Sequence, residues 1–190
     1  MDIDFYFDFT SPYSYFAAHQ VDALAEKHGC QVAWRPFLLG VAMQVTGQGV
    51  LVEQPLKGDY SLLDMKRMAR HMGLPFAMPD PFPVRSLASS RAFYWLLEQD
   101  AGLARQMALA NFKACFGDGE NTALPETVVR IAAGLGVDPD ACLAAMDDQA
   151  NKDRLRDETE NAIKRGVFGA PFFFIGDEPF WGNDRLEWMD

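Results

Sequence analysis

The chain has 190 residues, of which 49% are hydrophobic and 23% charged, a composition typical of a globular protein with a hydrophobic core. Its formal net charge of −10 argues against binding to nucleic acid or to an anionic membrane surface, because phosphate binding needs a basic surface. No run approaches the roughly 20 apolar residues of a membrane span, and the acidic N-terminus lacks the basic start of a secretory signal. We therefore expect a cytoplasmic protein.

The three cysteines, Cys30, Cys115 and Cys142, are scattered along the chain. None belongs to a CxxC pair, and no histidine lies at metal-ligand spacing from them. An odd, unpatterned set argues against a disulfide framework or a zinc site. We expect all three to be small buried side chains.

The first forty residues predict a strand, a helix and a second strand. Residues 2 to 8 alternate and are rich in aromatic side chains, which indicates a strand. Ser11 and Pro12 then mark the start of a helix that runs to Gly29, and residues 31 to 38 read as the second strand. Because the connection is helical, the two strands should be parallel.

The middle of the chain reads as helical. Residues 41 to 58 have no clear period and predict a loop or a broken helix, and a proline-punctuated loop spans residues 73 to 84. Apolar periodicity and capping signals predict helices over residues 60 to 71, 86 to 99, 101 to 115, 125 to 134, 139 to 146 and 151 to 166.

The C-terminal part returns to strands. PFFFIG predicts a buried strand, DEPFWG a turn with a short strand, and NDRLEWMD the start of a helix capped by Asn183 or Asp184. We therefore expect an α/β domain made of residues 1–40 and 165–190, with an all-helical insertion over residues 41–164.

One short stretch carries the first chemical signal. In DFTSPYSYFA, residues 8 to 17, replacing both serines of Ser-Pro-Tyr-Ser by cysteine would give a redox pair at a helix start. Ser11 is either a helix cap or part of an anion site formed by the free N–H groups and the helix dipole, and the pattern alone favours the cap. If a thiolate lies here, a bound small molecule must supply it.

A second signal lies in RGVFGAPFFFIGDEPFWGNDRL, residues 165 to 186. Pro171 is either a cis proline, which would turn the backbone of Ala170 toward an extended ligand, or a trans proline at a strand start. Asp184 either caps the last helix or, with neighbouring N–H groups, binds the charged groups of an amino acid. Trp181, next to this site, is either a core side chain or a ligand contact, and the core is the expected place.

Together these motifs resemble a known family. The order of strand, SPYS turn, helix, strand, helical insertion, GxFGxP, strand and FWGxDRL resembles the thioredoxin-like 2-hydroxychromene-2-carboxylate isomerases. That family is related to the kappa-class glutathione transferases and the Dsb-type oxidoreductases. The resemblance covers nearly the whole chain and is strongest at residues 4 to 17 and 165 to 187. It implies an α/β, thioredoxin-like fold with a large all-helical insertion, and a homodimer.

The resemblance also implies glutathione as cofactor. Ser11 takes the place of the redox cysteine, and its hydroxyl would hydrogen-bond the glutathione sulfur and stabilise the thiolate. The backbone of Ala170, before Pro171, would pair with the cysteinyl part, and Asn183 and Asp184 would hold the γ-glutamyl end.

The resemblance further implies roles around residues 48 to 64. Lys57, Tyr60 and Asp64 reproduce a family pattern; Lys57 would bind a carboxylate of glutathione or substrate, although a solvated loop lysine is the simpler alternative. Gln48 stands where the family often has asparagine, and we expect it beside glutathione. Tyr60 and Pro12 are expected at the acceptor substrate.

Arg85 departs from the family pattern, which often has asparagine there. It is expected either to clamp a substrate carboxylate in bidentate fashion or to be an ordinary surface arginine. Because the loop QGVLVEQPLKG also departs from the family, the resemblance is less informative about the exact substrate than about glutathione.

The resemblance predicts an isomerase that acts on 2-hydroxychromene-2-carboxylate or a related small aromatic 2-oxo or hemiketal acid. The alternatives are a kappa-like glutathione transferase or peroxidase, and a non-catalytic thioredoxin-like binding module. A dithiol oxidoreductase is excluded, because Ser11 and Ser14 cannot form a disulfide.

Overall fold

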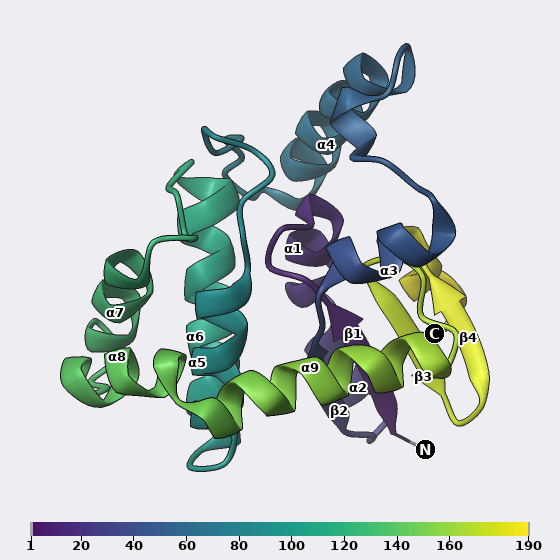
Figure 1. Cartoon of the computed structure of the whole chain (residues 1–190). Coiled ribbons are helices and arrows are strands. Elements are labelled where there is room, and N and C mark those ends of the chain that lie inside the picture. The colour runs from purple at the N-terminus through teal and green to yellow at the C-terminus, as the bar shows by residue number, and fades with distance from the viewer. Residues whose placement is uncertain (1, 190) are drawn as a thin grey trace.

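The computed structural model describes residues 2–189, which form a four-stranded mixed sheet covered by helices (Figure 1). The strand order is β2-β1-β3-β4, with β1 at Ile3–Phe7, β2 at Val32–Pro36, β3 at Phe172–Ile175 and β4 at Glu178–Trp181. β1 and β2 are parallel, as predicted, whereas β3 is antiparallel to β1 and β4 to β3. The α/β, thioredoxin-like prediction is therefore confirmed.

The helix between the first two strands is broken. α1 spans Pro12–Ala18 and α2 spans Val21–Lys27, so the single helix predicted here is wrong. Gln20 lies at the break, and its side-chain amide donates a hydrogen bond of 3.2 Å to the carbonyl of Phe16. The break contains neither glycine nor proline. The helical pattern of the sequence is therefore not interrupted there, which is why one continuous helix was predicted.

The middle of the chain is helical, as predicted. Residues 41 to 58 hold a broken helix, and α4 begins three residues before its predicted start. α9 begins two residues early because the Asp148 side chain accepts hydrogen bonds from the N–H groups of Ala150 and Asn151. The elements are α3 at Leu39–Thr46, the 3₁₀ helix η1 at Leu51–Glu53, α4 at Lys57–Met72, α5 at Leu87–Leu97, α6 at Ala101–Phe112, the π-helix η2 at Lys113–Gly117, α7 at Pro125–Ala133, α8 at Pro139–Asp147 and α9 at Gln149–Lys164.

Strands β1 and β3 are buried on both faces. Phe5 and Phe173 point into the larger apolar cluster, whereas Tyr6, Phe172 and Phe174 point into a smaller one that also includes side chains of α3 and α9. α9 crosses in front of the strands in Figure 1. Burial on both faces explains why β3 is a continuous apolar run rather than an alternating one.

The larger cluster joins the sheet to the helices of the middle region. The ring of Phe7 lies 5.7 Å from the rings of Phe93 on α5 and Phe112 on α6, and Phe9 lies 5.0 Å from Phe112. Residues inside and outside the proposed insertion 41–164 therefore share one core. Between residues 2 and 189, no helix is both long and apolar enough to cross a membrane.

The C-terminal segment forms the 3₁₀ helix η3 at Asn183–Trp188. Its capping position is Gly182, which has φ 104° and no side chain to cap with. The prediction that Asn183 or Asp184 caps this helix is therefore wrong. Both residues lie within its first turn instead.

Candidate functional site

Three segments from distant parts of the chain meet at one end of the sheet. β1 ends where β3 begins, because Tyr6 pairs with Phe172, and β4 ends there too, because Phe172 pairs with Trp181. The turn after β1, the peptide before β3 and the turn after β4 therefore converge. These are the segments of the two sequence motifs.

Ser11 connects two of these segments. It is 4% exposed and takes the N-cap position of α1, where its Oγ accepts a hydrogen bond of 3.2 Å from the N–H of Ser14. The same hydroxyl donates a hydrogen bond of 3.0 Å to the carbonyl of Ala170. The expected cap is thus confirmed, and its hydroxyl also reaches the second motif.

The first turn of α1 keeps one unpaired donor. Pro12 occupies its first position and has no N–H, and the N–H groups of Ser14 and Tyr15 bond to Ser11. For the N–H of Tyr13, the structure of residues 2–189 offers no acceptor. This N–H is therefore available to a ligand.

The Ala170–Pro171 peptide is cis, one of the two alternatives that the sequence left open. Beside it, Trp181 is 51% exposed, so its expected place in the core is wrong. Its indole lies against Gly169 and makes an edge contact of 4.9 Å with Phe168. The sequence placed Trp181 next to this site but did not indicate its exposure, because an isolated tryptophan gives no signal of the surface it covers.

Asn183 and Asp184 complete this end of the sheet. Asn183 is 8% exposed, and its amide group donates to the Met68 sulfur on α4 at 3.0 Å. Asp184 is exposed and pairs with Arg185 at 3.1 Å. η3 packs against α1, which places this pair beside the Ser11 turn.

Tyr13 lies next to two carboxylates, each of which is also paired with an arginine: Asp64 with Arg67 and Asp184 with Arg185. Its hydroxyl lies 3.4 Å from an Asp64 carboxylate oxygen on α4. Burial, and then Asp64, raise the pKa of Tyr13 to about 12, with smaller effects in the same direction from Tyr60 and Asp184. The two carboxylates and Tyr60 therefore lie around the Tyr13 phenol. The sequence did not indicate that Tyr13 would lie beside these groups.

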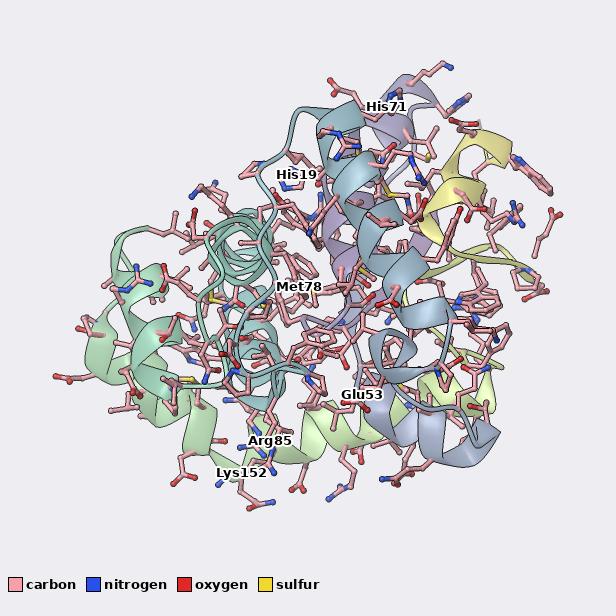
Figure 2. The ribbon with its side chains drawn as sticks, turned by 90° about the horizontal axis from the view of Figure 1, so that it is seen from above. His19, Glu53, His71, Met78, Arg85 and Lys152 are labelled. Carbon is pink, nitrogen blue, oxygen red and sulfur yellow. The ribbon has the colours of Figure 1, made fainter. Side chains whose placement is uncertain are left out.

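The remaining predicted residues have no such connection to Ser11. Gln48, Lys57 and Arg85 are exposed, and within residues 2–189 their side chains make no hydrogen bond or ion pair. Tyr60 is exposed as well. In Figure 2, Arg85 and Lys152 lie next to each other, at the opposite end of the view from His19 and His71.

Asp8, three residues before Ser11, is a buried carboxylate that sequence analysis missed. One oxygen accepts from the N–H of Thr10 at 3.0 Å and the other from the N–H of Leu39 at 2.6 Å, and Ser86 also bonds to it. Burial raises the pKa of Asp8 despite these bonds. The sequence FDF, in which an acidic residue lies between two aromatic residues at the end of a strand, could have indicated a buried carboxylate.

The cysteines take no part in this region. Cys115 and Cys142 are buried and free, and burial raises the pKa of their thiols to about 12 and about 11. Cys30 is free and only half-buried. Within residues 2–189, no group of three or more histidine, cysteine, aspartate or glutamate side chains is placed to hold a metal ion.

Comparison with known proteins identifies the family of this chain. Residues 2–190 match the DSBA-like thioredoxin domain. The chain is 33% identical to 2-hydroxychromene-2-carboxylate isomerase of Pseudomonas putida over 98% of this chain and 91% of that protein. It is 27% identical to glutathione S-transferase kappa 2 of Caenorhabditis elegans over 97% of this chain and 88% of that protein. A solved structure of a 2-hydroxychromene-2-carboxylate isomerase superposes with a TM-score of 0.90 at 31% identity, covering 100% of this chain and 92% of the other. The chain therefore belongs to the 2-hydroxychromene-2-carboxylate isomerase family of DSBA-like thioredoxin-fold proteins.

Proposed function

We propose that the protein is a glutathione-dependent isomerase of 2-hydroxychromene-2-carboxylate or a related product of aromatic ring cleavage. The observation that carries this proposal is the Ser11 hydroxyl, which lies between the first turn of α1 and the backbone of Ala170 where a redox protein of this fold would hold a thiol. A hydroxyl there can bind a thiolate but cannot form a disulfide.

The residues present fit a peptide-like thiol. The Ala170 carbonyl, next to Pro171, offers an acceptor for a backbone N–H, and the free N–H of Tyr13 offers a donor for an anion. The carboxylates of Asp64 and Asp184 suit the ammonium group of a γ-glutamyl end. In this proposal Asn183 and Asp184 bind that end, and Lys57 and Gln48 bind outer parts of glutathione.

Glutathione would supply a thiolate that adds reversibly to the conjugated acid, permits rotation about the former double bond and is eliminated unchanged. The protein's part is to favour the thiolate. The Ser11 hydroxyl and the Tyr13 N–H can both donate to an anion, and hydrogen bonds to the charged form lower the pKa of a thiol. Because the Ser11 proton bonds to the Ala170 carbonyl in this structure, it must leave that oxygen to serve a sulfur.

The proposal also covers the contacts of the acceptor, the cellular location and the oligomeric state. Tyr60, Arg85 and Pro12 stay proposed contacts of the acceptor. A cytoplasmic location suits an enzyme that needs reduced glutathione. A homodimer is also proposed. Leu56, just before α4, and Leu63 on α4 are exposed apolar side chains, and sedimentation equilibrium of the wild type beside Leu63→Lys tests whether this surface is the interface.

Ser11→Ala tests the function, with Ser14→Ala as the matched control. Ser14 lies on the same helix, but its hydroxyl is buried and has no partner within residues 2–189. We expect Ser11→Ala to lower glutathione-dependent kcat/KM by about 10²- to 10³-fold, the usual effect of removing one donor to a developing anion. It should also raise the pKa of enzyme-bound glutathione, measured by thiolate absorbance against pH. Unchanged turnover in a folded Ser11→Ala protein would refute the role.

A kappa-like transferase is the second candidate, favoured by the 27% identity to a glutathione S-transferase kappa 2 over nearly the full chain. Both candidates use the same sulfur site. Glutathione consumption separates them, because a transferase depletes glutathione stoichiometrically and an isomerase does not. A binding module without catalysis would give no glutathione binding by calorimetry.

A further inference from the structure

Asp8 joins three segments of the chain through one buried carboxyl group. The side chain is 1% exposed, and its two oxygens accept from the N–H of Thr10 at 3.0 Å and the N–H of Leu39 at 2.6 Å. The hydroxyl of Ser86 is the third donor. Within residues 2–189, no positively charged side chain pairs with this carboxyl. It therefore serves as a shared hydrogen-bond acceptor and not as half of a salt bridge.

Two of these donors lie at the starts of helices that have no cap of their own. The N-cap position of α3 is Leu38, whose apolar side chain cannot accept a hydrogen bond. The N-cap position of α5 is Ser86, a favoured capping residue, yet its side chain makes no bond to the helix. The Leu39 N–H and the Ser86 hydroxyl are directed to Asp8 instead. Asp8 thereby fixes the starts of both helices relative to the end of β1.

The same residue shapes the turn that leads to Ser11. The Asp8 carboxyl accepts from Thr10, two residues on, and the Asp8 main-chain carbonyl accepts from the N–H of Ser11, three residues on, at 3.0 Å. These are the side-chain and main-chain bonds of a tight turn. The Ser11 hydroxyl that follows lies between the N–H of Ser14 and the carbonyl of Ala170. A shift of the turn would move this hydroxyl relative to both partners.

Only a carboxyl group suits this junction. Burial disfavours its charged form and raises the pKa of Asp8, so the position is costly for an acid. The titratable neighbour on η2 is the thiol of Cys115, whose pKa burial raises to about 12, so this thiol stays neutral. An apolar side chain would leave the N–H groups of Thr10 and Leu39 without an acceptor, and an amide has one accepting oxygen where a carboxyl has two.

We propose that Asp8 is a positioning residue for Ser11: it fixes the turn that presents the Ser11 hydroxyl and the N–H of Tyr13 to a sulfur, and it is itself held by the starts of α3 and α5. This inference rests on the proposed function, in which the sulfur belongs to glutathione. Asp8 is buried and does not touch the ligand. It acts on how well Ser11 stabilises a thiolate and not on the peptide-like contacts at Ala170 and Asn183.

A thiol placed in the protein tests this role without glutathione. In a Ser11→Cys background, the pKa of the introduced thiol is measured from the rate of iodoacetamide labelling against pH, resolved by peptide mass spectrometry. We expect Asp8→Asn to raise this pKa, so that labelling below it slows about tenfold, the value of one charge-assisted hydrogen bond. Loss of a negative charge alone would lower the pKa, and a role in stability alone would leave it unchanged. Either of these results overturns the proposal.

Variants of Ser86 carry the same test if Asp8→Asn does not fold. Ser86→Ala removes one donor and should raise the pKa of the introduced thiol, whereas Ser86→Thr keeps the hydroxyl and should keep the value of the Ser11→Cys parent. Thr159→Val is the control, because the Thr159 hydroxyl accepts from the N–H of Leu38 at 3.1 Å but makes no bond to the turn. No rise in Ser86→Ala, or an equal rise in Thr159→Val, overturns the proposal.

Turnover with the natural serine at position 11 keeps the two proposals apart. We expect Asp8→Asn to lower kcat about tenfold and to change the KM for glutathione less than twofold, because the contacts at Ala170 and Asn183 remain. A loss confined to KM overturns the role of Asp8. A wild type that binds no glutathione contradicts the proposed function alone, since the measurement on the introduced thiol does not involve glutathione.

Discussion

Replacing Gly169 with alanine tests how the site's second motif is built. An added Cβ would lie 2.9 Å from Cε2 and 3.1 Å from Cδ1 of Trp181, and closer still to its Nε1. Real Cβ atoms essentially never come closer than 3.0 Å to another heavy atom, so the indole would have to shift. The φ angle of Gly169 is not positive, so the obstacle is the indole and not the backbone conformation.

The expected loss of stability follows from the buried area and the ring contact that Trp181 loses when its indole moves. The side chain is 51% exposed, so about half of the roughly 200 Å² of a tryptophan is buried, about 100 Å². At about 25 cal/mol per Å² this area contributes about 2.5 kcal/mol, and the edge contact with Phe168 adds about 1 kcal/mol. The lower chain entropy of alanine in the unfolded state offsets about 0.7 kcal/mol. Since a displaced ring recovers part of its burial, we expect Gly169→Ala to lower the free energy of unfolding by about 2 kcal/mol.

A double-mutant cycle in urea isolates this collision. Gly169→Ala should cost about 2 kcal/mol in the wild-type background. In a Trp181→Ala background, where the ring is absent, only the unfolded-state term remains, and Gly169→Ala should stabilise by about 0.7 kcal/mol. Glutathione affinity, measured by calorimetry, should fall in Gly169→Ala because Ala170 is the next residue. An equal cost in both backgrounds would show that Trp181 is not the reason for the glycine.

Two further predictions concern titratable groups away from the reacting sulfur. Because the pKa of Asp8 is raised above its ordinary 3.8, the folded state binds more protons than the unfolded state just above that pH, and wild-type stability falls as the pH rises through the window up to the raised pKa. The unfolding free energy of Asp8→Asn minus that of wild type, from urea titrations between pH 4 and 8, should therefore increase with pH and then level off; a constant difference contradicts the raised pKa. Iodoacetamide at pH 8 should label half-buried Cys30 first and reach Cys115 and Cys142 only on unfolding, as read by peptide mass spectrometry; early labelling of Cys115 would contradict its burial.

The features that sequence analysis recovered are those specified within a few residues. The alternation of IDFYF and the apolar run PFFFI fix β1 and β3, and a serine followed by proline fixes the start of α1. The cis peptide at Pro171 was accessible as one of two alternatives, because the Ala-Pro pair stands directly before a strand.

The features that it missed depend on partners distant in the chain. The exposure of Trp181 is set by Gly169 and Phe168 across a turn, and the environment of Asp8 by Leu39 and Ser86. The burial of the Asp8 carboxylate among three hydrogen-bond donors produces no periodic pattern in the sequence. A cavity of about 580 Å³ between η1, α4 and the loop after α4 is likewise assembled from separate segments, so its lining could be identified only after these elements were placed.

Ser11 shows why capping and thiolate binding are not competing roles. A hydroxyl has two lone pairs and one proton. The cap uses a lone pair, which accepts from the Ser14 N–H at 3.2 Å, and leaves the proton for a second partner. In this structure that partner is the Ala170 carbonyl at 3.0 Å, the same oxygen that a peptide-like ligand would engage. A ligand N–H at that oxygen would compete with the serine proton and release it toward a sulfur, so the cap can hold the serine in place while its proton changes partner.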